Sequence, residues 1–299
     1  ISGRKYHYQW RQSYCNWRGP RFESEHHHGS KNCCIDYFNA NKNQLAFLNA
    51  IAPIQAETGL SVKILGKCTP LEPYAETLLN FIDQHPWCEI GGFISRQALL
   101  REMTQATLLA LPSLEENLPM VILEAMAAGL PVVVSDWDGY RFTVRDNVEG
   151  FLIPTLGGAP GPIGEGIAIR HTMGLDSYQS YVGVVAQHTA VHVGRAAEAI
   201  ASLVRSPDLR KRMGAAGRTR VREVFDWPVV IRQMKALFAD MTKLRAAAPE
   251  PPPPVARLNP LRGDPFADFA HFATHGLDLD LPLHLRPGVS LADLDRTQT

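Results

Sequence analysis

Short apolar runs alternate with longer amphipathic stretches through the first half of the chain. Each run has the length of a buried strand, and each stretch repeats its apolar side chains at the three- to four-residue spacing of a helix. The predicted strands are residues 35–38, 61–65, 87–90, 107–111 and 131–135. Strands that alternate with helices in this way predict an α/β fold built on a doubly wound parallel sheet.

The ends of the predicted helices carry recognisable signals. Pro119 suits the first turn of a helix and Gly129 suits its end, while Ser95 can cap an earlier helix. Further along, a charged amphipathic helix is predicted over residues 208–224, and Asp226 can cap a last one. Ligands of open parallel sheets bind beyond the carboxyl ends of the strands, so functional residues are expected in the loops that follow them.

Two carboxylates, Glu116 and Glu124, lie eight residues apart in the strand, turn and helix unit over 107–131. Glu116 lies in the loop beyond the carboxyl end of the strand, and Glu124 is nearly two turns into the helix, from where it can reach the same crevice. The amino terminus of this helix offers free backbone N–H groups and a partial positive charge. The alternative is that Glu116 is a solvated loop residue or helix cap and that Glu124 is a helix-surface carboxylate.

The sequence over 112–131, PSLEENLPMVILEAMAAGLP, resembles the E-x7-E region of the family 4 retaining glycosyltransferases of GT-B architecture. The likeness continues through residues 135–141 and 149–154 and, more loosely, over 35–245. The resemblance implies a Rossmann-like domain that forms the donor half of a GT-B fold, with extra carboxyl-terminal helices and a tail.

The resemblance also implies roles for individual residues. Glu116 would contact the donor sugar as the catalytic residue, and Glu124 would bind the ribose hydroxyls of the nucleotide. The other donor-binding candidates in this unit lie around the start of the helix, where phosphate oxygens or sugar hydroxyls can meet backbone N–H groups. They are Asn117, Leu118, Met120 and Val121.

Lys42 is the expected cationic partner of the diphosphate. It follows the first predicted strand, as a lysine does in the family, but Tyr37 stands at the position of the family's arginine. The missing charge would then come from Lys67, which follows Gly66 at the end of the second strand, or from Arg96. The plainer interpretation of Lys42 is a solvated loop lysine.

Two further segments are candidates for donor contacts. The turn over 91–95 resembles the family segment near the nucleobase, which makes Phe93, Ile94 and Ser95 the predicted base site, although a glycine pair before a helix is often only a turn. Gly139, after the fifth strand, would let the backbone approach a ligand closely, and the acidic residues beside it can hydrogen-bond hydroxyl groups.

Composition narrows the choice of partners. The chain has 30 basic and 30 acidic residues in 299, so its charge gives no support for nucleic acid or for a strongly anionic surface as partner. Basic and aromatic residues do interleave over residues 4–21, which predicts an irregular leader more readily than a binding segment. With no secretory signal and no spanning apolar run, we expect a cytoplasmic protein, and peripheral association with the inner face of a membrane stays open.

The cysteines and histidines point to no metal centre. Five cysteines without C-x-x-C spacing predict a reducing compartment rather than a disulfide framework. Cys15, Cys33 and Cys34, with the histidines over 26–28, do not match the spacing of the usual zinc sites. We therefore expect no cofactor and no required metal, with the nucleotide sugar as a co-substrate.

Composition and pattern divide the chain into four parts. Residues 1–34 are expected to be an irregular leader or remnant, and residues 35–245 the nucleotide-sugar donor-binding domain. A Gly- and His-rich insertion over about 156–192 is expected to be a lid or a surface loop. A Pro-rich, stiff linker over 246–256 precedes a tail over 257–299, which has too few apolar residues for a core of its own. The tail is expected either to dock on the domain or to lead into further sequence.

The leading hypothesis is a glycosyltransferase that moves a hexosyl group from a nucleoside diphosphate sugar to an acceptor hydroxyl with retention. The acceptor, whether glycan, lipid or small molecule, is held by an amino-terminal half in the family. Residues 1–34 are too short for that half, so we expect an incomplete enzyme, either a fragment or the product of a broken reading frame. The alternatives are a non-catalytic nucleotide-sugar binding or scaffold module and a GT-B nucleotide-sugar epimerase.

Overall fold

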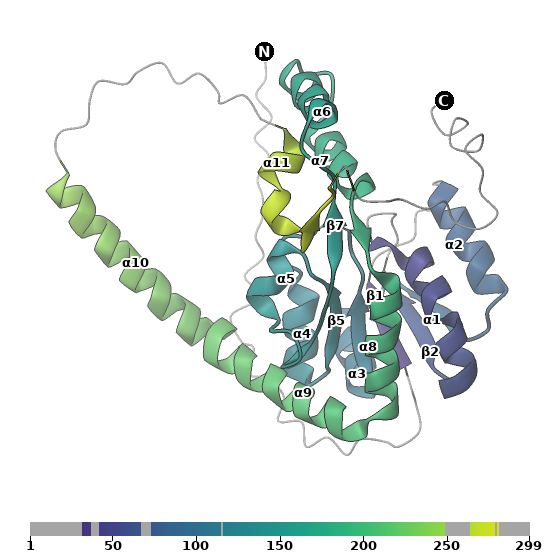
Figure 1. The fold of residues 1–299 in the computed structure, drawn as a ribbon. Helices are drawn as coiled ribbons and strands as arrows, with labels where there is room; N and C mark the ends of the chain where they lie inside the picture. The colour runs from purple at the N-terminus through teal and green to yellow at the C-terminus, as the bar shows by residue number, and fades with distance from the viewer. Residues whose placement is uncertain are drawn as a thin grey trace, which may run out of the picture.

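A six-stranded parallel sheet, flanked by helices on both faces, forms the centre of the molecule (Figure 1). The computed structural model describes residues 42–66, 73–114, 116–248, 264–278 and 280, and the backbone of residues 32–36. The strand order is β3-β2-β1-β4-β5-β6. The strands are β1 (Asn32–Asp36), β2 (Ser61–Leu65), β3 (Cys88–Gly92), β4 (Leu108–Leu111), β5 (Val132–Ser135) and β6 (Gly150–Ile153).

The strand order reverses between β1 and β4, which is the place where open α/β sheets bind ligands. The helices that connect the strands are α1 (Gln44–Thr58), α2 (Pro73–Asp83), α3 (Arg96–Gln105), α4 (Met120–Ala128) and α5 (Asp138–Thr143). The loops that precede these helices therefore meet at one edge of the sheet. The predicted fold class, an α/β doubly wound parallel sheet, is confirmed.

Two hydrophobic clusters cover the two faces of the sheet. Along β4, Leu108 and Ala110 belong to one cluster, whereas Leu109 and Leu111 belong to the other, because successive side chains of a strand point to opposite faces. The first cluster contains side chains of α1, α2 and α8 (Val193–Arg205), and the second contains those of α3, α4 and α5. Strands buried on both faces explain the continuous apolar runs in the sequence.

The strand boundaries differ most from the predictions at β1 and β3. β1 begins at Asn32 rather than at residue 35, so the predicted boundary of the leader at residue 34 lies inside a strand that pairs with β2 and β4. β3 extends to Gly92, so the predicted turn at the glycine pair is strand. A Cβ on Gly91 would lie 2.4 Å from Cδ2 of Leu65, so the Leu65 side chain occupies the space beside this glycine.

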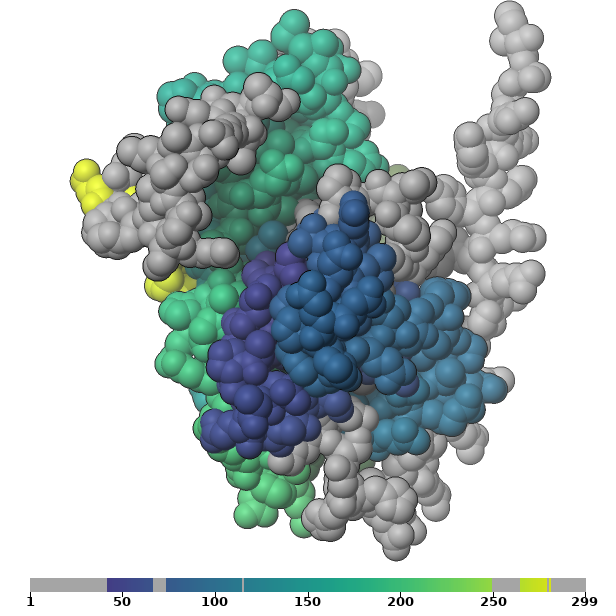
Figure 2. All heavy atoms as spheres, turned by 90° about the vertical axis from the view of Figure 1, so that its right-hand side faces the viewer, coloured from purple at the N-terminus to yellow at the C-terminus, as the bar shows by residue number. Residues whose placement is uncertain are grey.

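The insertion predicted over 156–192 as a lid or surface loop is a helical hairpin, α6 (Pro162–Thr172) and α7 (Tyr178–Gln187). Pro162 opens α6, and the Ser177 hydroxyl accepts a hydrogen bond from the Ser180 backbone N–H to cap α7. Short strands β7 (Thr155–Gly157) and β8 (Ala190–Val191) join the hairpin to the domain. In Figure 2 the hairpin stands at one end of the molecule, beyond α1 and α2.

The tail docks on the domain, as the sequence allows. Its short helix α11 (Pro265–Asp268) contacts α6 and α7, and its strand β9 (His275–Gly276) pairs with β7. The Asp264 carboxylate accepts hydrogen bonds from the backbone N–H groups of Gly161, at 2.5 Å, and Phe266, at 2.8 Å. Phe266 is buried. The tail therefore fastens the base of the α6–α7 hairpin.

The last long helices follow the sequence pattern closely. α9 (Pro207–Arg220) continues through a π-helical turn (Val221–Phe225), and the Asp226 carboxylate then caps α10 (Trp227–Ala247). α10 extends two residues into the predicted linker over 246–256 and projects away from the sheet (Figure 1). The linker beyond Ala248 lies outside the described residues. No helix in the described part of the chain is both long and apolar enough to cross a bilayer.

Burial raises the pKa of the Cys88 thiol to about 12. The thiol should therefore stay protonated and resist alkylation by iodoacetamide at about pH 8.5, near the ordinary pKa of a thiol. Because the folded pKa lies above the unfolded one, the stability that the neutral thiol contributes is present below the unfolded pKa and falls as the pH rises through the folded pKa. Peptide mapping by mass spectrometry should find Cys88 modified only after unfolding, and rapid labelling of the folded chain would contradict its burial.

Candidate functional site

Lys42 and Glu116 meet across the point where the strand order reverses. Lys42 lies in the turn before α1, and Glu116 lies in the loop between β4 and α4, 74 residues further along the chain. The Lys42 ammonium donates to the Glu116 carboxylate in an ion pair whose side chains are only 19% and 17% exposed. The structure thus brings together the two charged groups that were predicted to flank the sugar and the diphosphate.

A second ion pair lies at the same edge of the sheet. Arg96, the first residue of α3, places Nη2 at 3.0 Å from Oε1 of Glu124 in α4. The Arg96 side chain is 48% exposed, whereas that of Glu124 is 20% exposed. Arg96 was one of the two residues considered for the missing positive charge, and it contacts the carboxylate predicted to bind ribose. Lys67, the other candidate, and Tyr37 lie outside the described residues.

The amino terminus of α4 lies four residues beyond Glu116, at Met120. Pro119 precedes the helix in an extended conformation, and its side chain provides no cap. The side chains of Leu118 and Met120 are exposed, and Val121 lies partly buried behind them. A helix start offers unpaired N–H groups and a positive potential, so the main chain here can receive an anionic group.

A buried contact fixes the loop that carries Glu116. Gly139, in α5, is buried, and a Cβ on it would lie 1.3 Å from the carbonyl oxygen of Asn117. The close approach predicted between Gly139 and a ligand is therefore an approach to the protein's own backbone. Asn117 is held against α5 by this contact, which only glycine allows.

Three polar side chains that sequence reasoning missed support the same loop. The Tyr140 hydroxyl lies 3.2 Å from Oγ of Ser113 and donates to it, and the Ser135 hydroxyl donates to the Ser113 carbonyl oxygen at 2.6 Å. All three residues are buried. A serine directly after an apolar run was the available signal, because a hydroxyl buried at a strand end requires a partner.

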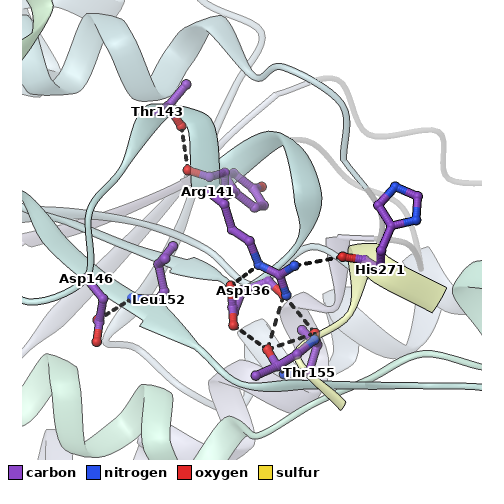
Figure 3. A network of polar contacts seen from close by, with 9 residues as sticks. Asp136, Arg141, Thr143, Asp146, Leu152, Thr155 and His271 are labelled. Carbon is purple, nitrogen blue, oxygen red and sulfur yellow. Dashed lines mark hydrogen bonds and ion pairs between the residues drawn. The ribbon is translucent and has the colours of Figure 1, made fainter. Parts of the chain in front are cut away.

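Asp136 takes part in packing contacts rather than lying open to a ligand. Its carboxylate accepts hydrogen bonds at 2.5 Å from Nε of Arg141 and from the hydroxyl of Thr274 in the tail. Its carbonyl oxygen accepts the Thr155 hydroxyl, and Arg141 also donates to the His271 carbonyl oxygen (Figure 3). The expectation that acidic residues here bind ligand hydroxyls is therefore replaced, for Asp136, by a link between β5, α5 and the tail.

The segment predicted as the base site lies at the surface between β3 and α3. Phe93 is 82% exposed, Ile94 packs partly against the second cluster, and the Ser95 hydroxyl accepts a hydrogen bond from the Ala98 backbone N–H to cap α3. Gly66 follows β2 and donates its N–H to the Gly92 carbonyl oxygen at 2.9 Å. An exposed aromatic ring provides a surface on which a base can stack.

No group of three or more His, Cys, Asp or Glu side chains within the described ranges is arranged to hold a metal ion. Of the residues considered for zinc, Cys15 and the histidines over 26–28 lie outside those ranges, and Cys33 and Cys34 are described only as backbone. The positive charges that the described site offers are those of Lys42 and Arg96 and the start of α4.

Comparison with known proteins agrees with this geometry. Residues 33–158, which include both ion pairs, match the family described as glycosyl transferases group 1. The chain is 30% identical over 169 residues to alpha-maltose-1-phosphate synthase of Mycolicibacterium smegmatis, covering 55% of this chain and 36% of that protein. It is 32% identical over 123 residues to phosphatidyl-myo-inositol mannosyltransferase of Mycobacterium leprae, covering 41% of this chain and 23% of that protein. The matches thus span about a quarter to a third of these relatives.

Solved structures show the same fold. Sucrose-phosphate synthase from Thermosynechococcus elongatus matches 73% of this chain with 46% of its own, at a TM-score of 0.50 and 21% identity. HepE from Anabaena, solved in complex with UDP and glucose, matches 71% of this chain with 48% of its own, at a TM-score of 0.51 and 17% identity. The fold is the Rossmann-like α/β fold of GT-B glycosyltransferases. Together the comparisons show that part of this chain is similar to group 1 glycosyltransferases.

Proposed function

We propose that the chain is the donor-binding part of a family 4 retaining glycosyltransferase. It moves a hexosyl group from a nucleoside diphosphate sugar to an acceptor hydroxyl of a glycan, a lipid or a small molecule. The observation that carries this proposal is the Lys42–Glu116 ion pair across the point where the strand order reverses. The similarity of the chain to a maltose-1-phosphate synthase and to a mannosyltransferase supports the same proposal.

The charges of the pair suit both sides of the bond that breaks. Departure of a nucleoside diphosphate builds negative charge on the phosphate and positive character on the sugar ring. Lys42 and the start of α4 meet the first charge, and Glu116 meets the second while accepting hydrogen bonds from sugar hydroxyls. In the free protein Lys42 and Glu116 neutralise each other, and the donor replaces this contact with one contact for each of them.

The remaining donor contacts follow from the same geometry. Glu124 accepts the ribose hydroxyls, and the surface at Phe93 and Ile94 receives the base. The acceptor attacks from the face that the diphosphate leaves, which retains the configuration at the anomeric carbon. Lys42 and the helix start supply the positive charge, so the proposed reaction uses a nucleotide sugar as co-substrate and no metal.

Binding of nucleotide sugars tests this proposal directly. UDP-, GDP- and ADP-hexoses should be titrated against the chain in calorimetric and thermal-shift experiments. A donor at about one hundred times its Kd stabilises a protein by about 2.7 kcal/mol, which for a domain of this size raises the Tm by about 5–10 °C. A chain that none of these compounds stabilises would contradict the proposed function.

Lys42→Ala should weaken donor binding about 10- to 100-fold, because a hydrogen bond to a charged group contributes about 1.5–3 kcal/mol. The matched control is Lys211→Ala, which removes an exposed lysine of α9. Calorimetry should give the control the affinity of the unchanged chain. Equal donor affinities for Lys42→Ala and Lys211→Ala would show that the Lys42 ammonium does not contact the donor.

A further inference from the structure

Arg96 joins two neighbouring connections of the sheet through a single carboxylate. It begins α3, directly after the Ser95 cap, and reaches Oε1 of Glu124 in α4 with Nη2 at 3.0 Å. α3 and α4 pack against each other, and Met103 of α3 and Ile122 of α4 are buried in the same cluster. Packing of the two helices therefore fixes the backbone positions of Arg96 and Glu124, and the ion pair joins the ends of their side chains.

The contact leaves acceptor capacity on Glu124. An ionised carboxylate has two oxygens with about four lone-pair positions, and the recorded Arg96 contact uses Oε1. Oε2 of Glu124 and the second lone pair of Oε1 can accept hydrogen bonds from O–H groups of a ligand. A glutamate on a helix has three rotatable bonds, so a carboxylate held by a planar guanidinium loses less freedom when a ligand binds than an unanchored one.

We propose that Arg96 is a positioning residue that orients the Glu124 carboxylate to accept both hydroxyls of the ribose of the donor. This inference rests on the proposed function, because it requires that Glu124 meets the nucleoside part of a nucleotide sugar. A cis-diol presents two O–H groups at a fixed spacing, and a carboxylate accepts both only when its plane is held in one orientation. Arg96 thereby sets the preference for ribose over 2′-deoxyribose.

The ratio of the affinities for ribo- and 2′-deoxyribonucleotides isolates the positioning role of Arg96. Affinities of the chain for UDP, GDP and ADP and for their 2′-deoxy counterparts should be measured by calorimetry. For the base that binds best, Arg96→Ala should weaken ribonucleotide binding about 5- to 10-fold, the value of one ordinary hydrogen bond. Binding of the 2′-deoxynucleotide, which cannot make the paired contact, should stay nearly unchanged.

Two further variants separate positioning from other effects. Arg101→Ala removes an exposed arginine of the same helix and should leave both affinities unchanged. Arg96→Lys keeps a donor to Glu124 without the planar fork and should recover part of the ribose preference. The Tm of Arg96→Ala should equal that of the unchanged chain, because an ion pair with so exposed an arginine contributes little to folding.

The possible results have distinct meanings. Equal losses for ribo- and deoxyribonucleotides in Arg96→Ala would show a general electrostatic or phosphate contact and would overturn the positioning role. The positioning role would also be overturned if Arg96→Ala bound both kinds of nucleotide as tightly as the chain without substitutions. It would be overturned as well if the chain without substitutions bound ribo- and 2′-deoxyribonucleotides equally. In both cases the proposed donor binding would stand. Failure of the unchanged chain to bind any of the three nucleotides or the nucleotide sugars would reject the proposed function and this inference together.

Discussion

Glu116→Gln should lower the rate of sugar transfer about 100-fold or more and leave the protein folded. The amide keeps the size of the side chain and one oxygen that can accept from Lys42, so the loop before α4 retains a contact across the sheet edge. The negative charge is lost, and with it the stabilisation of positive character on the sugar ring. One of the two acceptor oxygens that fix the sugar hydroxyls is lost as well.

The measurement is the rate at which nucleoside diphosphate is released from a donor that binds, with and without an acceptor. Glu198→Gln is the matched control, since Glu198 is also paired with a basic side chain, that of Arg195, at 2.8 Å, but lies on the surface of α8. The control should transfer sugar at the unchanged rate. If Glu116→Gln kept most of the rate, Glu116 would not be the catalytic residue, and a binding or scaffold role would fit better.

Gly139→Ala should both destabilise the fold and weaken donor binding. The new methyl group would meet the Asn117 carbonyl oxygen at 1.3 Å, and backbone cannot rotate away as a flexible side chain does. Forcing a methyl group into a tightly packed site costs about 1–3 kcal/mol. Because Asn117 directly follows Glu116, the displaced loop should move Glu116 away from Lys42.

Urea unfolding and donor calorimetry on the same preparation test this effect. Gly183→Ala is the matched control, because Gly183 lies inside helix α7 and a Cβ there meets no atom within 4 Å. Alanine should stabilise that helix by about 0.5–1 kcal/mol and leave donor binding unchanged. A Gly139→Ala protein with unchanged stability would show that the contact between α5 and the Glu116 loop yields more easily than its geometry indicates.

Much of the central domain could be predicted from local signals. The apolar run over Ser61–Leu65 is a strand with the predicted bounds, and α4 begins after Pro119 and ends before Gly129. These signals are reliable because strand burial, proline at a helix start and a left-handed glycine at its end each depend on a few adjacent residues. The helices of the insertion over 156–192 were harder to predict, because its glycines and histidines are typical of loops. Capping of its helices and packing against α11 make it helical.

The candidate site could be predicted only in part. The positions of Glu116 and Lys42 at one sheet edge follow from the strand and helix pattern, and the structure shows their contact. That Asp136 faces Thr274 rather than a ligand could not be foreseen, because 138 residues separate them and no periodicity connects them. The same holds for Gly139, whose small size serves the Asn117 backbone.

The sequence by itself determined the α/β architecture, the edge at which the charged side chains lie and the resemblance of residues 112–131 to a sugar-transferring family. Only the tertiary structure decided which charges pair, Lys42 with Glu116 and Arg96 with Glu124, and which polar groups support the loop between them. The physical reason is the separation along the chain of the residues that interact. Strand and helix signals arise between neighbours along the chain, whereas an ion pair depends on how separate connections meet after the sheet has formed.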